Sequence, residues 1–336
     1  MAFCQHRVSL PGMNETAERS GEIGHRTVTE ASVMGFGCLT GDYAQMHFDL
    51  EFGHGAGMGG PIAHGLLSAA WSLGALTLYA PQRLAIGDPK AYLGGFRIRF
   101  SRMVHIGDRF SLRWAVGSAP CVDGLEAFAP LNTEFEILNQ RGEMTCTGAV
   151  SVCHADAAGD SPGLPALPEL LVIEACSTEP QATPLFAEDL VAQGPRGESL
   201  GRTVSEADVV GFANFSGELN PVYLNEVFAR SGRFGTRIAS PMWTFCIGFG
   251  DYLRELLSIS MPSSGFAGHL GDSWRFLAPI RIGDTIRTRH RPLSCEASKS
   301  RPGMGIVEFG LQLLNQRDEI VQDGRVAMMI PMRRDD

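Results

Sequence analysis

The sequence predicts an α+β protein built from two similar halves, each an antiparallel sheet wrapped around one long helix. Residues 26–66 align without a gap on residues 202–242, which lie 176 positions further on, and thirteen of the 41 aligned positions are identical. The same offset relates FSRMVHIGD, residues 100–108, to FLAPIRIGD, residues 276–284. An offset that stays constant over about 125 residues indicates two copies of one domain.

Each half is expected to begin with a short strand, residues 24–28 and residues 200–204, followed by a helix. Thr29 and Ser205 stand where these helices would start, and their side-chain oxygens can accept hydrogen bonds from free backbone N–H groups. The glutamate that follows each of them favours the positive end of a helix. Both helix starts are therefore predicted from local chemistry alone.

A second helix in each half is long and apolar. Residues 62–79 are apolar almost all round, which is typical of a buried helix but also hints at a membrane span. The matching residues 242–259 contain Asp251, Arg254 and Glu255. Since the equivalent segment tolerates three charges, we expect a buried core helix and no membrane span.

Strands are expected after the long helix, because apolar and charged residues alternate there. Phe96, Ile98 and Phe100 alternate with arginines, and similar runs occupy residues 133–137 and 307–313. A period of two with one apolar face is typical of antiparallel strands that are covered on one side. The long helix is the one apolar element large enough to cover them.

Three regions follow from this pattern. We expect an N-terminal domain at residues 1–153, a linker at residues 154–199 and a C-terminal domain at residues 200–336. The predicted linker is rich in Pro, Gly, Ala and Asp, a composition typical of a segment that crosses a surface.

Composition narrows the class of protein. The net charge of −9 argues against a nucleic-acid partner, which would require a basic face. The eight cysteines form no C-x-x-C pair, so neither a zinc site nor a disulfide framework is indicated. The first residues lack the apolar stretch of a signal peptide, and the cytoplasm is the expected location.

Two motifs of the first half carry a resemblance to a known family. Gly41, Asp42 and His47 form the pattern G-D-x-x-x-x-H, and residues 62–65 read I-A-H-G. With the R-F-x-x-P-x-x-x-G-D motif at residues 275–284, the sequence resembles the MaoC-like (R)-specific enoyl-CoA hydratases from about residue 20 to 333. The resemblance implies a tandem, or double, hot-dog fold and hydro-lyase activity.

The resemblance also implies roles for four residues. Hydration of a 2-enoyl thioester requires a water that loses a proton as it attacks Cβ, a proton for Cα, and a donor for the thioester oxygen. Asp42 and His47 are expected to bind the water, one as base and the other as acid, in an order that stays open. The N–H of Gly65, at the start of the long helix, is expected to bind the oxygen. His64 either contacts the substrate or only packs the helix start.

The second half has lost this chemistry. Glu218, Tyr223, Ser240 and Pro241 stand at the four positions, and proline has no N–H to donate. We therefore expect one catalytic copy, in the first half, and a degenerate second copy that completes the substrate pocket.

Two other functions stay open. A hot-dog thioesterase would typically carry a carboxylate on the central helix, and the first half has none between residues 62 and 79. A non-catalytic acyl-thioester binding protein would suit the second half better than the first. The expected substrate is an acyl-CoA or acyl-carrier-protein thioester. No cofactor and no metal is expected, and a homodimer is one of the assemblies that stay open.

Overall fold

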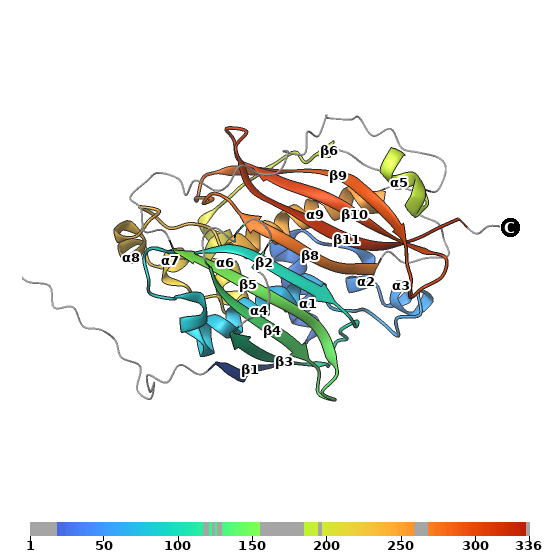
Figure 1. Ribbon diagram of the computed structural model, residues 1–336, viewed down its shortest axis with the longest axis horizontal. Coiled ribbons are helices and arrows are strands. Elements are labelled where there is room, and N and C mark those ends of the chain that lie inside the picture. The colour runs from blue at the N-terminus through green and yellow to red at the C-terminus, as the bar shows by residue number, and fades with distance from the viewer. Residues whose placement is uncertain are drawn as a thin grey trace, which may run out of the picture.

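The two halves repeat the same order of elements in a computed structural model (Figure 1). The structure describes residues 19–116, 121–122, 125, 130–154, 185–193, 197–258 and 268–333.

The strands that the alternating pattern predicted at residues 96–100 and 133–137 are present in the first half as parts of β2 and β4. Its strands are β1 (Ser20–Thr27), β2 (Ala91–Phe100), β3 (Arg109–Val116), β4 (Leu131–Leu138) and β5 (Met144–His154). Its helices are α1 (Glu30–Thr40), α2 (Gln45–Phe48), α3 (Leu50–Gly55) and α4 (Gly65–Tyr79), followed by the 3-10 turn η1 (Pro81–Leu84).

The second half follows the same plan. Its helices are α6 (Glu206–Ser216), α7 (Pro221–Leu224), α8 (Glu226–Ser231) and α9 (Pro241–Ser258). Its strands are β6 (Gly197–Glu198), β7 (Arg202–Thr203), β8 (Gly268–Phe276), β9 (Thr285–Ala297), β10 (Met304–Leu314) and β11 (Ile320–Pro331). The helices α6, α7 and α8 begin and end 176 residues after α1, α2 and α3, so the offset seen in the sequence is also an offset of structure.

One antiparallel sheet runs through both halves. Its strand order is β1-β3-β4-β5-β2-β8-β11-β10-β9-β6, and β7 pairs with β9 beside this path. The halves meet where β2 pairs with β8. There Gly95 pairs with Arg275 and Arg99 pairs with Gly271. Under the offset Gly95 corresponds to Gly271 and Arg99 to Arg275, so each of these pairs maps onto the other. The junction therefore has the symmetry of a two-fold dimer interface inside one chain.

The long helices α4 and α9 form the core under this sheet, as Figure 1 shows. Twelve of the residues of α4, from Leu66 to Thr77, are buried. The predicted core helix is therefore confirmed, although it begins at Gly65 rather than near residue 62. Among the described helices, none is long and apolar enough to cross a bilayer.

The capping predictions are also confirmed. The Thr29 side chain accepts a hydrogen bond from the Ser32 N–H, and the Ser205 side chain accepts one from the Asp208 N–H. Each of these helix starts is a reciprocal capping box, in which the third helical residue bonds back to the cap.

The predicted linker differs in part from expectation. Most of residues 154–199 lies outside the described residues. The part that is described holds the helix α5 (Ala187–Gln193), which contacts β9 and β10, and the strand β6, which pairs with β9. This part of the segment therefore contributes to the second half rather than only connecting the halves.

Candidate active site

A tight turn after α1 brings the first-half motif together. The helix α1 ends at Thr40, and Gly41 has a φ of 76°, a left-handed conformation that suits glycine. The chain then reverses through Asp42 into α2, which carries His47. Arg254 of α9 donates a hydrogen bond of 3.1 Å to the Gly41 carbonyl, so the second half braces this turn.

Asp42 and His47 face one another in the interior. Their side chains are buried, with residue exposures of 5% and 7%. The Asp42 Oδ2 and His47 Nε2 atoms lie 4.0 Å apart, which is too long for a direct hydrogen bond. The two groups that the sequence places five residues apart therefore converge, with a gap between their polar atoms.

The tautomer of His47 follows from its second nitrogen. His47 Nδ1 lies 2.8 Å from the Ile62 carbonyl oxygen, which can only accept, so Nδ1 carries the proton. Burial lowers the pKa of His47, while the Asp42 carboxylate opposes that shift. The neutral ring then presents a lone pair at Nε2, toward Asp42.

His64 packs behind this pair. Its ring stacks on that of His47, with centroids 3.7 Å apart and an interplanar angle of 26°. Its Nε2 donates to the Asp42 backbone carbonyl at 3.1 Å, and its Nδ1 is buried without a hydrogen-bond partner among the described residues. Burial and the neighbouring His47 hold the pKa of His64 well below its usual value. Of the two roles left open for His64, the structure shows the packing contact.

Asp42, His47 and His64 also form a group that could hold a metal ion. Each offers one ligand atom, and these atoms lie within 4.8 Å of one another. A metal ligand must point its in-plane lone pair at the ion. The His47 Nδ1 and His64 Nε2 atoms are engaged by backbone carbonyls. The absence of a metal stays our expectation.

Gly65 stands at the first position of α4, where the N–H has no partner inside the helix. No acceptor in the described part of the chain bonds this N–H. A Cβ on Gly65 would lie 2.9 Å from the Phe100 ring, so only glycine fits without moving that ring. The site therefore combines a buried carboxylate–imidazole pair with a free N–H at a helix start.

The first half has Ala44-Gln45 where the second half has Asn220-Pro221, and this difference has a structural consequence. In the second half the Asn220 side chain accepts a hydrogen bond from the Val222 N–H and caps α7. Ala44 cannot do this, and the Asp42 Oδ1 atom accepts from the Ala44 N–H at 3.2 Å instead. One carboxylate oxygen of Asp42 thus holds the turn, and the other faces His47.

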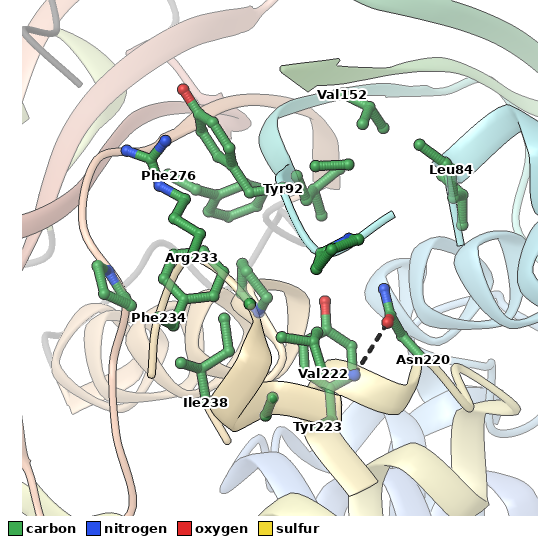
Figure 2. A pocket seen from close by; sticks show the side chains of 18 of the residues that line it. Leu84, Tyr92, Val152, Asn220, Val222, Tyr223, Arg233, Phe234, Ile238 and Phe276 are labelled. Atoms are coloured by element: carbon green, nitrogen blue, oxygen red, sulfur yellow. Dashed lines mark hydrogen bonds between the residues drawn. The ribbon is translucent and has the colours of Figure 1, made fainter. Parts of the chain in front are cut away.

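The second half encloses a cavity of about 70 Å³ at the equivalent place. Figure 2 shows that both halves contribute to its wall, for example Leu84 and Tyr92 from the first and Val222 and Tyr223 from the second. Glu218 lies at this cavity and accepts a hydrogen bond of 2.6 Å from the Ser240 hydroxyl. Burial raises the pKa of Glu218 to about 7.

His269, on β8, was not among the residues that the sequence singled out. Its ring centroid lies 4.7 Å from that of Phe100 and 4.6 Å from that of Phe249 in α9. The signal that could have found it is the repeat itself, since the offset places His269 opposite an apolar residue, Leu93. The first-half site is thus bordered by side chains of the second half.

Fold and site together define the class: a tandem α+β protein with one buried Asp–His pair in its first half. The MaoC-like domain model matches residues 14–124 and 190–305, so the chain belongs to the MaoC-like domain family. The family resemblance inferred from the motifs is thereby confirmed.

Two curated relatives align with part of the chain. The chain is 30% identical over 156 residues, or 46% of its length, to a 3-hydroxybutyryl-CoA dehydratase of Methylorubrum extorquens, 90% of which is covered. It is 38% identical over 135 residues, or 40% of its length, to an (R)-specific enoyl-CoA hydratase of Rhodospirillum rubrum, 85% of which is covered.

Solved structures support the fold over the whole chain. A MaoC-domain dehydratase from Chloroflexus aurantiacus superposes with a TM-score of 0.69 at 17% identity, covering 94% of this chain and 95% of that one. A Mycobacterium tuberculosis protein described as having a double hot-dog fold gives a TM-score of 0.64 at 17% identity, covering 91% and 93%. At this identity the likeness concerns the fold, and the predicted double hot-dog architecture is confirmed.

Proposed function

We propose that the first half catalyses the reversible hydration of a 2-enoyl thioester to a (3R)-3-hydroxyacyl thioester. One observation carries the proposal: the buried Asp42–His47 pair, 4.0 Å apart, lies near a helix start whose Gly65 N–H is free. The hydro-lyase class accords with both curated relatives, whose names are those of a dehydratase and a hydratase.

The 4.0 Å separation of the two side chains suits a bridging water molecule. A water about 2.8 Å from both the Asp42 Oδ2 and the His47 Nε2 atoms would see them at an angle of about 90°, which is acceptable for two hydrogen bonds. The neutral His47 offers its Nε2 lone pair as the base, and the Asp42 carboxylate accepts a hydrogen bond from the second O–H of the water and so orients it.

The proposed reaction adds the water in two steps, and His47 carries the proton between them. His47 takes a proton from the water while the water oxygen bonds to Cβ, and the thioester becomes an enolate. The same proton passes from His47 to Cα, so that one water is added across the double bond. In the reverse direction His47 removes the Cα proton and returns it to the leaving hydroxide.

The Gly65 N–H would bind the thioester oxygen. Negative charge builds on that oxygen as the enolate forms, and the N-terminal end of α4 adds a favourable dipole. Pro241 begins α9 at the equivalent position and has no N–H. The second half therefore lacks both the acid–base pair and this donor, and we propose that it serves the first site by forming part of its pocket.

The decisive test is an assay with crotonyl-CoA that follows loss of the conjugated thioester absorbance. Asp42→Asn keeps the shape of the side chain but weakens the group that orients the water, and it should lower kcat by about 10²-fold. Glu218→Gln, the matched change in the second half, should keep most of the activity.

Other outcomes would redirect the proposal. Release of free thiol instead of hydration would favour a thioesterase. Tight binding without turnover, for both CoA and carrier-protein thioesters, would favour a non-catalytic acyl-binding protein.

A further inference from the structure

A carboxylate–imidazole pair on β8 has no counterpart in the first half. His269 and Asp272 correspond under the 176-residue offset to Leu93 and Phe96 of β2. The strands β2 and β8 pair where the two halves meet. His269 of β8 contacts Phe249 of α9, and it also contacts Phe100 of β2, which lies against Gly65 of α4. The junction between the halves therefore carries a polar pair on β8 and two apolar residues at the equivalent positions of β2.

The residues that line the second-half cavity indicate which site the His269–Asp272 pair faces, because the 176-residue offset relates each of them to a residue of the other half. That cavity is lined by Glu218 and Tyr223 together with Leu93 of the first half. Under the offset, Glu218 and Tyr223 correspond to Asp42 and His47, and Leu93 corresponds to His269. Two further residues of this lining, Leu73 and Phe276, correspond under the same offset to Phe249 and Phe100.

The ring contacts agree with this correspondence. The His269 ring stacks on Phe249 at an angle of 20° and lies against Phe100. Phe100 in turn lies against Gly65, where a Cβ would approach its ring to 2.9 Å. The charge of His269 also contributes to lowering the pKa of His47. His269 thus belongs to the wall of the first-half site, on the side built by the second half.

Asp272 sets the orientation of His269. The His269 Nε2 and Asp272 Oδ1 atoms lie 2.9 Å apart, and the Asp272 carboxyl is fully buried. Burial raises the pKa of Asp272, and His269 opposes that shift. With Nε2 engaged by the carboxyl group, Nδ1 is the nitrogen left for another partner, and it makes no hydrogen bond among the described residues.

We propose that His269 contacts the acyl group in the first-half site and selects acyl thioesters that carry an oxygen substituent beyond Cβ. The inference rests on the proposed function of that site. A plain hydrocarbon chain would bury the free ring nitrogen without a partner, which is unfavourable. A substrate hydroxyl can donate a hydrogen bond to Nδ1 of the neutral ring, and a substrate carboxylate can accept one from Nδ1–H of the protonated ring. Sites built to hydrogen-bond a substrate discriminate strongly against analogues that lack the group.

The test is calorimetric binding of three saturated four-carbon thioesters: butyryl-CoA, 4-hydroxybutyryl-CoA and succinyl-CoA. The wild-type protein should bind at least one oxygenated ligand about tenfold or more tightly than butyryl-CoA. His269→Leu, which installs the residue found at the equivalent position, should abolish that preference. Leu93→His, the matched change at the second-half cavity, should leave it unchanged.

The two oxygenated ligands separate the chemistry of the contact. A preference for both indicates a hydrogen bond to oxygen, and a preference for succinyl-CoA alone indicates a charged group. Asp272→Asn keeps the shape of the pair and should reduce the preference for the oxygenated ligands. This second variant tests the same contact if His269→Leu does not fold.

The inference is overturned if the wild-type protein shows no preference, or if His269→Leu weakens all three ligands equally. Because saturated thioesters cannot be hydrated, this result is independent of turnover. A preference that depends on His269 in a protein without hydratase activity would refute the proposed reaction and leave the contact standing.

Discussion

Burial acts in opposite directions on the ionisable groups of the two equivalent sites. At the first site it favours the neutral form of His47 and His64, since a buried imidazolium is poorly solvated. At the second site it favours the neutral form of Glu218, whose pKa rises to about 7. Similar desolvation thus favours a neutral imidazole in one half and a neutral carboxylic acid in the other.

The pH dependence of the reaction should reflect the lowered pKa of His47. The base must be neutral, so kcat/KM should fall only when the pH drops below the range in which an ordinary histidine titrates. The measurement is the pH profile of kcat/KM with crotonyl-CoA. An acid limb at or above the pKa of an exposed histidine would contradict the assignment of His47 as base.

Glu218 should make the stability of the protein depend on pH. Its pKa rises from 4.5 to about 7 on folding, so the unfolded state loses this proton first as the pH rises. The stability it confers in neutral form is present below pH 4.5 and is lost as the pH rises through about 7. As the pH rises from acid to mildly alkaline values, the wild type should lose more unfolding free energy than Glu218→Gln does. The expected difference in urea unfolding is up to roughly 3 kcal/mol. An equal pH dependence for both proteins would show that Glu218 is not desolvated.

At the scale of elements, the start of α4 lies beside the Asp42–His47 pair. His64 occupies the N-cap position and donates to the Asp42 backbone carbonyl, and a Cβ on Gly65 would meet the Phe100 ring of β2. In the proposed reaction, the position of this helix start couples the Gly65 N–H to the Asp42–His47 pair.

Gly65→Ala tests this coupling. The added methyl group would lie 2.9 Å from the Phe100 ring and must displace either the ring or the helix start. We expect kcat to fall by about 10²-fold, as for loss of an oxyanion donor. Pro241→Ala at the start of α9 serves as the control in the crotonyl-CoA assay and should have little effect. Full activity of Gly65→Ala would show that the added methyl group does not displace the helix start, and it would contradict the proposed coupling.

Local sequence patterns predicted the starts of two helices but did not predict a third, short helix. The starts of α1 and α6 were predictable because a cap involves neighbours only three residues apart. The helix α5 was not, because its seven residues are too few for stability alone and depend on contacts with β9 and β10.

At the scale of the whole molecule, the pairing of β2 with β8 joins the two halves and places the second half against the first site. Gly271 lies in this junction, where a Cβ would approach the Ile98 carbonyl oxygen to 2.4 Å. The strands can approach this closely because that position has no side chain.

Gly271→Ala should therefore disturb both stability and activity. We expect a loss of about 1–3 kcal/mol, the usual cost of overpacking, together with a lower kcat/KM because the β8 wall moves. Gly268→Ala is the matched control on the same strand, since its Cβ would lie 3.7 Å from the nearest atom, an ordinary contact. Thermal unfolding and the crotonyl-CoA assay measure the two effects. A Gly271→Ala protein as stable and active as the control would show that the junction is adaptable.

The sequence by itself determined the duplication, the α+β class and the candidates Asp42, His47, His64 and Gly65. The duplication follows from the constant 176-residue offset, and the α+β class follows from the periodicity of apolar residues. The four candidates follow from short motifs that resemble those of a known family. Only the tertiary structure decided that the Asp42 carboxylate divides its two oxygens between the turn and His47, and that His269 borders a site more than 200 residues earlier in the chain. Such contacts depend on how β2 and β8 pair across the symmetric junction, and no local pattern specifies that pairing.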